Sequence, residues 1–141
     1  MAMTYLVPVD FSKGSAAALD YAIKLAKEDR AKLLLLHVIS ADFAFPLGAG
    51  FADTFEILEA NATKAMQALI RRKRLRPGQF RSLLVRGINP ADVIVAVAKK
   101  SRAAMIVMGS HGRSGFQRFL LGSVAERTVR QADCPVMIMK K

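Results

Sequence analysis

Glycine and serine residues follow an apolar run in the last third of the chain, and their types suit the binding of an anion. Residues 105–108 have the composition of a buried parallel strand, and Gly109 and Gly112 come after it. A second pair, Gly122 and Ser123, precedes a helix-like segment. Glycine lets the main chain approach a ligand, and the first turn of a helix leaves N–H groups unpaired. The two clusters therefore predict a phosphate site built from backbone amides.

Side chains near the two clusters would add to such a site. Arg113 and Arg118 offer charge-assisted donors, and the Ser123 hydroxyl offers a further one. An alternative stays open for Ser123: with Glu126 it has the spacing of a capping box, in which the hydroxyl bonds to the helix's own amide. His111 is either part of the site or a loop residue exposed to water, and the two arginines are either phosphate ligands or solvated charges.

The chain lacks the groups that phosphate chemistry needs. A phosphate loop that hydrolyses ATP carries lysine in the pattern Gly-x-x-x-x-Gly-Lys-Ser/Thr and an acid that holds magnesium, and no such lysine is present. No Ser/His/Asp spacing, Cys/His cluster or paired carboxylate indicates a nucleophile or a metal centre. We therefore expect no catalytic residue and no metal ligand, and turnover that is slow at most.

Apolar periodicity places these clusters on an alternating pattern of strands and helices. Strands are expected at residues 3–9, 32–38, 80–86, 105–108 and 136–139, and helices at 15–30, 51–74, 90–102 and 123–131. Asn89 is expected to cap the third helix and Pro90 to begin it. The alternation predicts one domain, residues 1–141, of the α/β class: a Rossmann-like five-stranded parallel open sheet, strand order 3-2-1-4-5, with helices on both faces.

In such a sheet a ligand lies outside the carboxyl ends of the strands, where the strand order reverses. That point is expected between the first and fourth strands, so Asp10 and Gly109 should face one another across the crevice. Asp10 is either a ligand-binding group or a turn former, and His37 at the end of the second strand is expected to be structural.

The spacing Gly109-x-x-Gly112, nine residues, Gly122-Ser123 resembles the ATP-binding signature of the universal stress protein (UspA-like) family. The resemblance extends over essentially the whole chain. It includes Val7-Pro8-Val9-Asp10, Leu36-His37-Val38, Gly87-x-x-Pro90 and Cys134-Pro135-Val136.

The resemblance implies ATP as the ligand, with magnesium as its companion ion. It also implies that Asp10 accepts hydrogen bonds from the ribose hydroxyls and that the main chain at Val38 pairs with an adenine edge. The nucleotide pocket that it implies is lined by Pro8, Val9, Asp10, Val38, Met108, Gly109, His111, Gly112, Arg113, Gly122, Ser123 and Val124.

The last predicted strand is apolar on both faces and lies at the end of the sheet, where an open edge is a liability. The resemblance implies that it pairs with its copy in a homodimer. The strand consists of Val136, Met137, Ile138 and Met139. In the alternative, Met137 and Met139 are covered by the chain's own helices.

The net charge is +11, from 22 basic and 11 acidic residues. From Lys64 to Arg102 there are eleven basic side chains and one acid, Asp92. We expect a solvated surface there, because residues 71–74 come at a helix end, where cations complement the helix dipole. A nucleic-acid or anionic-partner binding module is the alternative that the charge leaves open, although no interleaved aromatic residues provide a stacking platform.

Composition also bears on location. No apolar run approaches the ~18–20 residues that a membrane helix needs, and the first residues lack an export signal. The single cysteine, Cys134, cannot form an internal disulfide and is expected to be partly buried and unreactive. We therefore expect a cytoplasmic ATP-binding regulator or stress-tolerance factor. The alternatives are the basic binding module and a slow ATP hydrolase.

Overall fold

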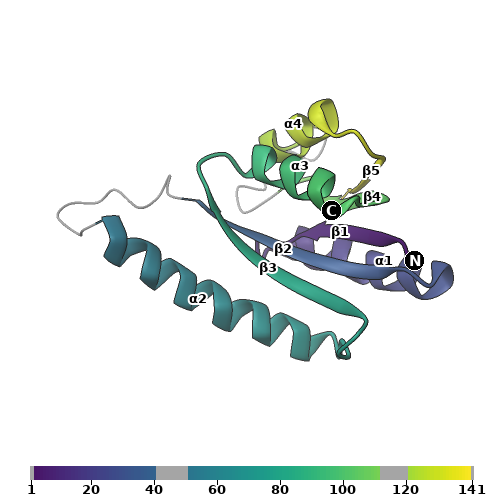
Figure 1. Cartoon of the computed structure of the whole chain (residues 1–141), viewed down its shortest axis with the longest axis horizontal. Coiled ribbons are helices and arrows are strands. Elements are labelled where there is room, and N and C mark those ends of the chain that lie inside the picture. The colour runs from purple at the N-terminus through teal and green to yellow at the C-terminus, as the bar shows by residue number, and fades with distance from the viewer. Residues whose placement is uncertain (1, 41–50, 112–120, 141) are drawn as a thin grey trace.

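The computed structural model describes residues 2–40, 51–111 and 121–140, with the side chains of residues 51–53 left aside. Five strands and four helices alternate along the chain (Figure 1). The strands are β1 Thr4–Pro8, β2 Lys32–Ser40, β3 Phe80–Gly87, β4 Met105–Gly109 and β5 Val136–Met139. The helices are α1 Lys13–Asp29, α2 Phe51–Arg72, α3 Pro90–Ser101 and α4 Ser123–Gln131.

All neighbouring strands are parallel, and their order is β3-β2-β1-β4-β5, which confirms the predicted topology. The order reverses between β1 and β4. As predicted, β3 and β5 are the two edge strands. The carboxyl ends of β1 and β4 therefore meet at the switch point of the sheet, where an open α/β fold accommodates a ligand.

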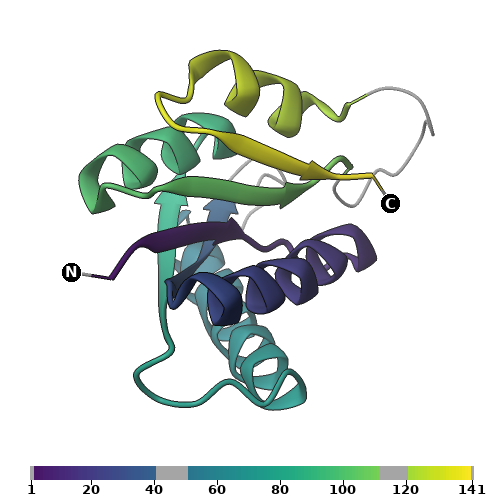
Figure 2. The same ribbon diagram turned by 90° about the vertical axis from the view of Figure 1, so that its right-hand side faces the viewer.

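The two faces of the sheet are covered by different helix pairs, as Figures 1 and 2 show. Side chains of a strand alternate between faces, so Val7 packs with α1 and α2 while its neighbour Leu6 packs with α3 and α4. Both side chains are fully buried. The long apolar run of β2 follows from this arrangement, because both of its faces lie in the core.

Helix boundaries differ from the predicted ones where a capping residue decides them. Helix α1 begins at Lys13, two residues earlier than expected, because the Ser12 hydroxyl accepts a hydrogen bond from the Ser15 amide at 3.2 Å. Helix α3 begins as predicted: the Asn89 side chain accepts from the Ala91 amide at 3.1 Å, and Pro90 occupies the first turn.

Two kinds of feature were sought in the part of the chain that the structure describes. None of its helices is long and apolar enough to cross a membrane, and its His, Cys, Asp and Glu side chains form no group of three or more that could hold a metal ion. Cys134 is half-buried at the start of β5. Burial, with the neighbouring charge of Asp133, raises the pKa of its thiol, which therefore stays protonated at neutral pH.

Candidate functional site

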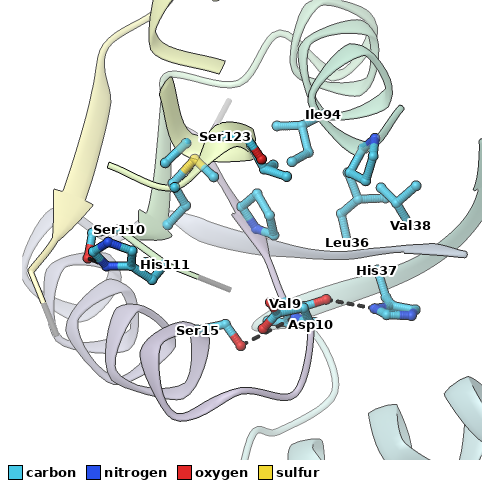
Figure 3. A pocket seen from close by; sticks show the side chains of 17 residues that line it. Val9, Asp10, Ser15, Leu36, His37, Val38, Ile94, Ser110, His111 and Ser123 are labelled. Carbon is cyan, nitrogen blue, oxygen red and sulfur yellow. Dashed lines mark hydrogen bonds between the residues drawn. The ribbon is translucent and has the colours of Figure 1, made fainter. Parts of the chain in front are cut away.

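A cavity of about 300 Å³ lies outside the carboxyl ends of β1, β2 and β4 (Figure 3). It contains every residue of the predicted pocket that belongs to the described part of the chain, whereas Gly112, Arg113 and Arg118 lie outside the described residues. Its walls are formed by Pro8, Val9, Asp10, Ser15, Leu36, His37, Val38, Pro90, Ile94, Met108, Gly109, Ser110, His111, Gly122, Ser123, Val124 and Ala125.

Three helices begin at this cavity. Ser15 comes from the first turn of α1, Pro90 from the first turn of α3, and Ser123 from the first turn of α4. In Figure 3, Asp10 and Ser15 lie on one side of the cavity, and Ser123 and Ile94 lie on the other. Helix N-termini carry partial positive charge and unpaired amides, so their convergence favours an anionic group in this space.

Helix α4 offers its amides most openly. Its N-cap is Gly122, and no side chain makes a capping hydrogen bond there. The capping box considered for Ser123 and Glu126 is therefore not formed: Ser123 is the first helical residue, and the Glu126 carboxylate accepts from Arg130 at 2.8 Å. The exposed Ser123 hydroxyl and the first-turn amides of α4 lie together in the cavity wall.

Strand β2 extends beyond its pairing with β1 and so presents main chain to the same cavity. Its pairing with β1 ends at Leu36 opposite Pro8, after which the Val9 amide donates to the Leu36 carbonyl at 2.7 Å. Strand β2 itself continues to Ser40 alongside β3. Because successive residues of a strand direct their backbone groups to alternate sides, those of Val38 face the β1 side, beyond the end of β1. Val38 thus combines an exposed main chain with a half-buried side chain.

Asp10 has a structural task as well as its place in the wall. Its carboxylate accepts hydrogen bonds from the Ser12 amide at 3.0 Å and from the Ser12 hydroxyl, and its amide donates to the Ser15 hydroxyl at 3.3 Å. These bonds fix the turn between β1 and α1. The turn-forming role considered for Asp10 is therefore present, and the carboxylate stays half-exposed beside the cavity.

The two histidines of the site differ. The His37 Nδ1 atom lies 2.8 Å from the Val9 carbonyl oxygen, and its ring packs against Phe11 with centroids 4.6 Å apart, as befits the structural role expected for it. The His111 Nδ1 atom lies 3.0 Å from the Ser110 hydroxyl. Within the described residues, its Nε2 atom is buried and has no hydrogen-bond partner. A buried nitrogen of this kind is suited to a ligand's polar group.

Two glycines of the predicted phosphate clusters, Gly109 and Gly122, lie in close contact with the backbone of other residues. A Cβ atom on Gly109 would lie 2.9 Å from the Gly14 carbonyl carbon and 3.0 Å from its oxygen. On Gly122 a Cβ atom would lie 3.0 Å from the Ser110 carbonyl oxygen, which already accepts the Gly122 amide at 2.7 Å. Glycine at 109 therefore allows the N-terminal turn of α1 to contact the end of β4. From the sequence, this glycine was predicted to let a ligand approach the main chain.

Sequence reasoning missed several wall residues. Ser15 and Ser110 are both buried, at 6% and 5% exposure. Ser15 was predicted as the first residue of the first helix, and Ser110 directly follows Gly109 in the predicted loop. Ile94 and Ala125 come from α3 and α4, and they reach the wall because the apolar face of each helix is turned toward the sheet. A search one helical turn beyond each predicted N-terminus would have found them, because side chains at i and i+4 share a face.

This arrangement defines a class of protein: a doubly wound parallel α/β domain with a crevice at its switch point and three helix N-termini around it. The family is equally clear. The family model described as the universal stress protein family matches residues 1–140, and the chain belongs to that family. A universal stress protein of Methanocaldococcus jannaschii is 33% identical over 138 residues, covering 96% of this chain and 81% of that protein.

Solved structures of the same family share the fold. Universal stress protein UspA from Lactobacillus plantarum superposes with a TM-score of 0.83 at 28% identity, with 97% of each chain covered. The universal stress protein from Archaeoglobus fulgidus in complex with dAMP gives 0.69 at 27% identity, with 98% of each chain covered. A universal stress protein in complex with cAMP gives 0.63 at 25% identity, covering 98% of this chain and 96% of that one.

Proposed function

We propose that this universal stress protein binds an adenine nucleotide in the cavity at the switch point. The observation that carries the proposal is the convergence of three helix N-termini on one space at the carboxyl ends of β1, β2 and β4. The complexes of related universal stress proteins with dAMP and cAMP support the choice of an adenine nucleotide. We favour ATP, with magnesium as the companion ion of its triphosphate, and a regulatory or stress-tolerance role in the cytoplasm.

Each part of the nucleotide has a matching group. The free backbone of Val38 would pair with the adenine edge, while the buried Ile94 and Met108 provide apolar contacts for the ring. Asp10 would accept from the ribose hydroxyls. The first-turn amides of α4, with the Ser123 hydroxyl, would bind phosphate oxygens.

The described wall of the cavity favours binding over hydrolysis. Its charged side chain is Asp10, an acid that brings no positive charge to phosphate groups and whose Oδ1 atom holds the β1–α1 turn. No lysine is among the wall residues of the described part of the chain. Phosphoryl transfer depends on cations that neutralise charge and on a group that positions water. We therefore infer a nucleotide-dependent switch with at most slow turnover.

Substitution of Ser123 by glutamate tests the site without harming the fold. Glutamate at the first helical position complements the dipole of α4, so the helix is not destabilised, but its carboxylate would repel the phosphates. We expect ATP affinity, measured by isothermal titration calorimetry, to fall roughly ten-fold or more in Ser123→Glu. Ser123→Ala is the control: it removes one neutral hydrogen-bonding group, which corresponds to about 0.5–1.5 kcal/mol.

If Ser123→Glu binds ATP as tightly as the wild type, the nucleotide does not lie against α4 and the proposal fails. Parallel titrations with AMP and ATP measure how much the outer phosphates contribute. A phosphate-release assay on the wild type decides between a switch and a hydrolase, because turnover at the rate of ordinary ATPases would contradict the inferred role.

We also propose a homodimer that forms through β5. All four of its side chains are half-buried, Met137 and Met139 against one face of the core and Val136 and Ile138 against the other. The chain's own helices thus cover part of each face, as considered for the methionines. The outer edge of the strand still ends the sheet. A twofold partner would pair with that edge.

The backbone of β5 offers a selective way to break such a dimer. The Pro135 and Met139 carbonyls accept bonds from β4, so the backbone groups of Ile138 point away from β4. Proline at Ile138 would remove an outward-facing N–H, whereas Ile138→Ala removes the same side chain and keeps it. We expect light scattering after size exclusion to show a dimer for Ile138→Ala and a monomer for Ile138→Pro. A monomeric wild type would contradict the proposed dimer.

A further inference from the structure

The amino-terminal edge of the sheet, opposite the cavity, gathers the positive charge of the chain. The α1–β2, α2–β3 and α3–β4 connections all lie there, along the left and lower left of Figure 2. More than half of the 22 lysines and arginines lie in or beside these connections. We call this set the basic edge: Lys27, Arg30, Lys32, Arg71, Arg72, Lys73, Arg74, Arg76, Arg81, Lys99, Lys100 and Arg102.

Backbone hydrogen bonds join the three connections into one row. The Ala104 amide donates to the Thr4 carbonyl at 2.8 Å, which ties the α3–β4 connection to the start of β1. The Lys32 amide donates to the Met3 carbonyl at 2.8 Å, and the Leu33 amide donates to the Gln79 carbonyl at 3.0 Å. Neighbouring strands lie about 4.8 Å apart. The cations therefore border a continuous edge and do not form separate patches.

Few acids offset this charge. Apart from Lys73, which is half-buried, every member of the basic edge is exposed. Within the described residues, the recorded ion pairs of these cations are Lys73 with Asp20 at 2.8 Å and Lys99 with Asp133 at 3.9 Å. The Asp29 carboxylate accepts a hydrogen bond from the Tyr5 hydroxyl. The basic edge thus presents a strong excess of positive charge to solvent.

Three arginines of this edge occupy positions that favour glycine. Arg30 and Arg102 cap the C-termini of α1 and α3, and Arg74 lies two residues beyond the end of α2. Each has a left-handed backbone with φ of 54°. The following residue in each case closes the helix with a bond back to the carbonyl five residues earlier, as in a Schellman motif. These bonds are Ala31 N to Ala26 O at 2.9 Å, Leu75 N to Ile70 O at 3.2 Å, and Ala103 N to Ala98 O at 2.9 Å.

Glycine adopts this conformation without the steric strain that a side chain adds. The chain nevertheless has arginine at all three positions. In the described part of the chain, three of the four left-handed non-glycine residues thus lie on this edge, and the fourth is Phe11 at the cavity end. Strained residues that cluster on one surface point to a function of that surface. Favourable placement of cations at helix C-termini accounts for part of the charge. It does not account for Lys32 and Arg81, which lie in strands, or for Arg76, which lies in a turn.

We propose that the basic edge binds the phosphate backbone of a nucleic-acid duplex without reading its sequence. Guanidinium groups bind phosphate oxygens through two parallel hydrogen bonds, and seven of the twelve cations are arginines. The nearby aromatic rings of Tyr5 and Phe80 pack against the core, so they provide no platform for unpaired bases. The surface is therefore suited to a duplex backbone and not to single strands.

A membrane surface fits this edge less well. Proteins that lie on anionic lipid combine cations with apolar side chains that enter the bilayer interface. Met3 is an exposed apolar residue at this edge, but Ile57, Ile88 and Leu121 lie elsewhere. The basic edge also lies at the opposite end of the sheet from the cavity, so its proposed activity does not depend on nucleotide binding.

The left-handed arginines permit a test that preserves the fold. In the triple variant Arg30→Gly, Arg74→Gly, Arg102→Gly, three guanidinium groups are lost while each cap receives the residue that it favours. The matched control Lys24→Gln, Lys64→Gln, Lys140→Gln removes the same charge from exposed positions outside the basic edge. Binding of a short fluorescent DNA duplex of mixed sequence is measured by anisotropy between about 50 and 200 mM salt.

We expect the wild type and the control to bind the duplex and the glycine variant to bind roughly ten-fold or more weakly. The slope of log K against log salt concentration should decrease by about three in the glycine variant. Its melting temperature should not fall, which separates lost contacts from lost folding. The proposal fails if the wild type does not bind at the low salt concentration, if both variants lose affinity equally, or if phosphatidylserine vesicles bind more tightly than the duplex.

Discussion

The two ends of the sheet use glycine in opposite ways. At the cavity end, Gly109 is required because a Cβ atom would collide with the backbone of Gly14. At the basic edge, Arg30, Arg74 and Arg102 occupy left-handed positions where glycine would be less strained. At Gly109 the cavity end has the residue that its packing demands, although Phe11 in the β1–α1 turn is also left-handed, with φ of 66°. At three positions the basic edge keeps a charged residue against local preference.

The contrast teaches that two kinds of position carry information about function: a glycine that packing requires, and another residue at a left-handed position where glycine is favoured. Gly109 in a ligand-binding signature is explained by contact between two segments of the chain, so its presence alone is weak evidence for a ligand. An arginine at a left-handed cap has no comparable packing reason. The cavity is better argued from its helix N-termini, and the basic edge from its strained residues.

The largest effect that we expect from this contrast is the loss of unfolding free energy when a methyl group is added at the cavity end. Gly109→Ala would place its Cβ atom 2.9 Å from the Gly14 carbonyl carbon. Overpacking against backbone destabilises by about 1–3 kcal/mol, to be measured by urea denaturation. Gly122→Ala meets one oxygen at 3.0 Å and should cost less. A Gly109→Ala protein as stable as the wild type would show that close packing does not require this glycine.

A smaller effect is expected at the basic edge, where Tyr5 donates a hydrogen bond to Asp29. This bond, together with burial and the charge of Asp29, raises the pKa of Tyr5 above its ordinary value of 10. The neutral phenol is the donor, so its stabilising contribution is present below pH 10 and is lost as pH rises through the raised pKa. Tyr5→Phe should lose about 1 kcal/mol near neutral pH, and the difference should fade at higher pH.

The exposed Tyr21 of α1 provides the control for this substitution, since Tyr21→Phe removes a hydroxyl that makes no bond to Asp29. Urea unfolding from pH 7 to pH 11 is the measurement. A Tyr5→Phe difference that stays constant through this range would mean that lost packing, and not the hydrogen bond, explains the change.

The fold could be predicted almost completely from the sequence. Buried strands such as residues 33–36 are uninterrupted apolar runs, and the amphipathic helices between them have a clear period. The alternation then restricts the topology to a few parallel arrangements. The boundaries were less predictable: α1 starts early because of the Ser12 cap, and β2 continues to Ser40 because β3 pairs with it throughout.

The candidate site was predictable in position but not in its internal contacts. The switch point follows from strand order, which places Asp10 near Gly109 without any knowledge of side chains. The carboxylate's bonds to Ser12, and the uncapped start of α4 at Ser123, depend on local backbone geometry that periodicity does not encode. The charge of the basic edge was seen in part, because nine of its twelve cations lie in the basic stretch from Lys64 to Arg102. Their meeting with Lys27, Arg30 and Lys32 could not be predicted, since it depends on the helices ending side by side.

The hydrogen bond from the Gly122 amide to the Ser110 carbonyl closes the stem of the segment between them. The bond holds the start of α4 beside the end of β4, two elements that are separated by more than ten residues along the chain. A group that binds against the first turn of α4 would therefore also lie against the end of β4, whatever sequence connects the two elements.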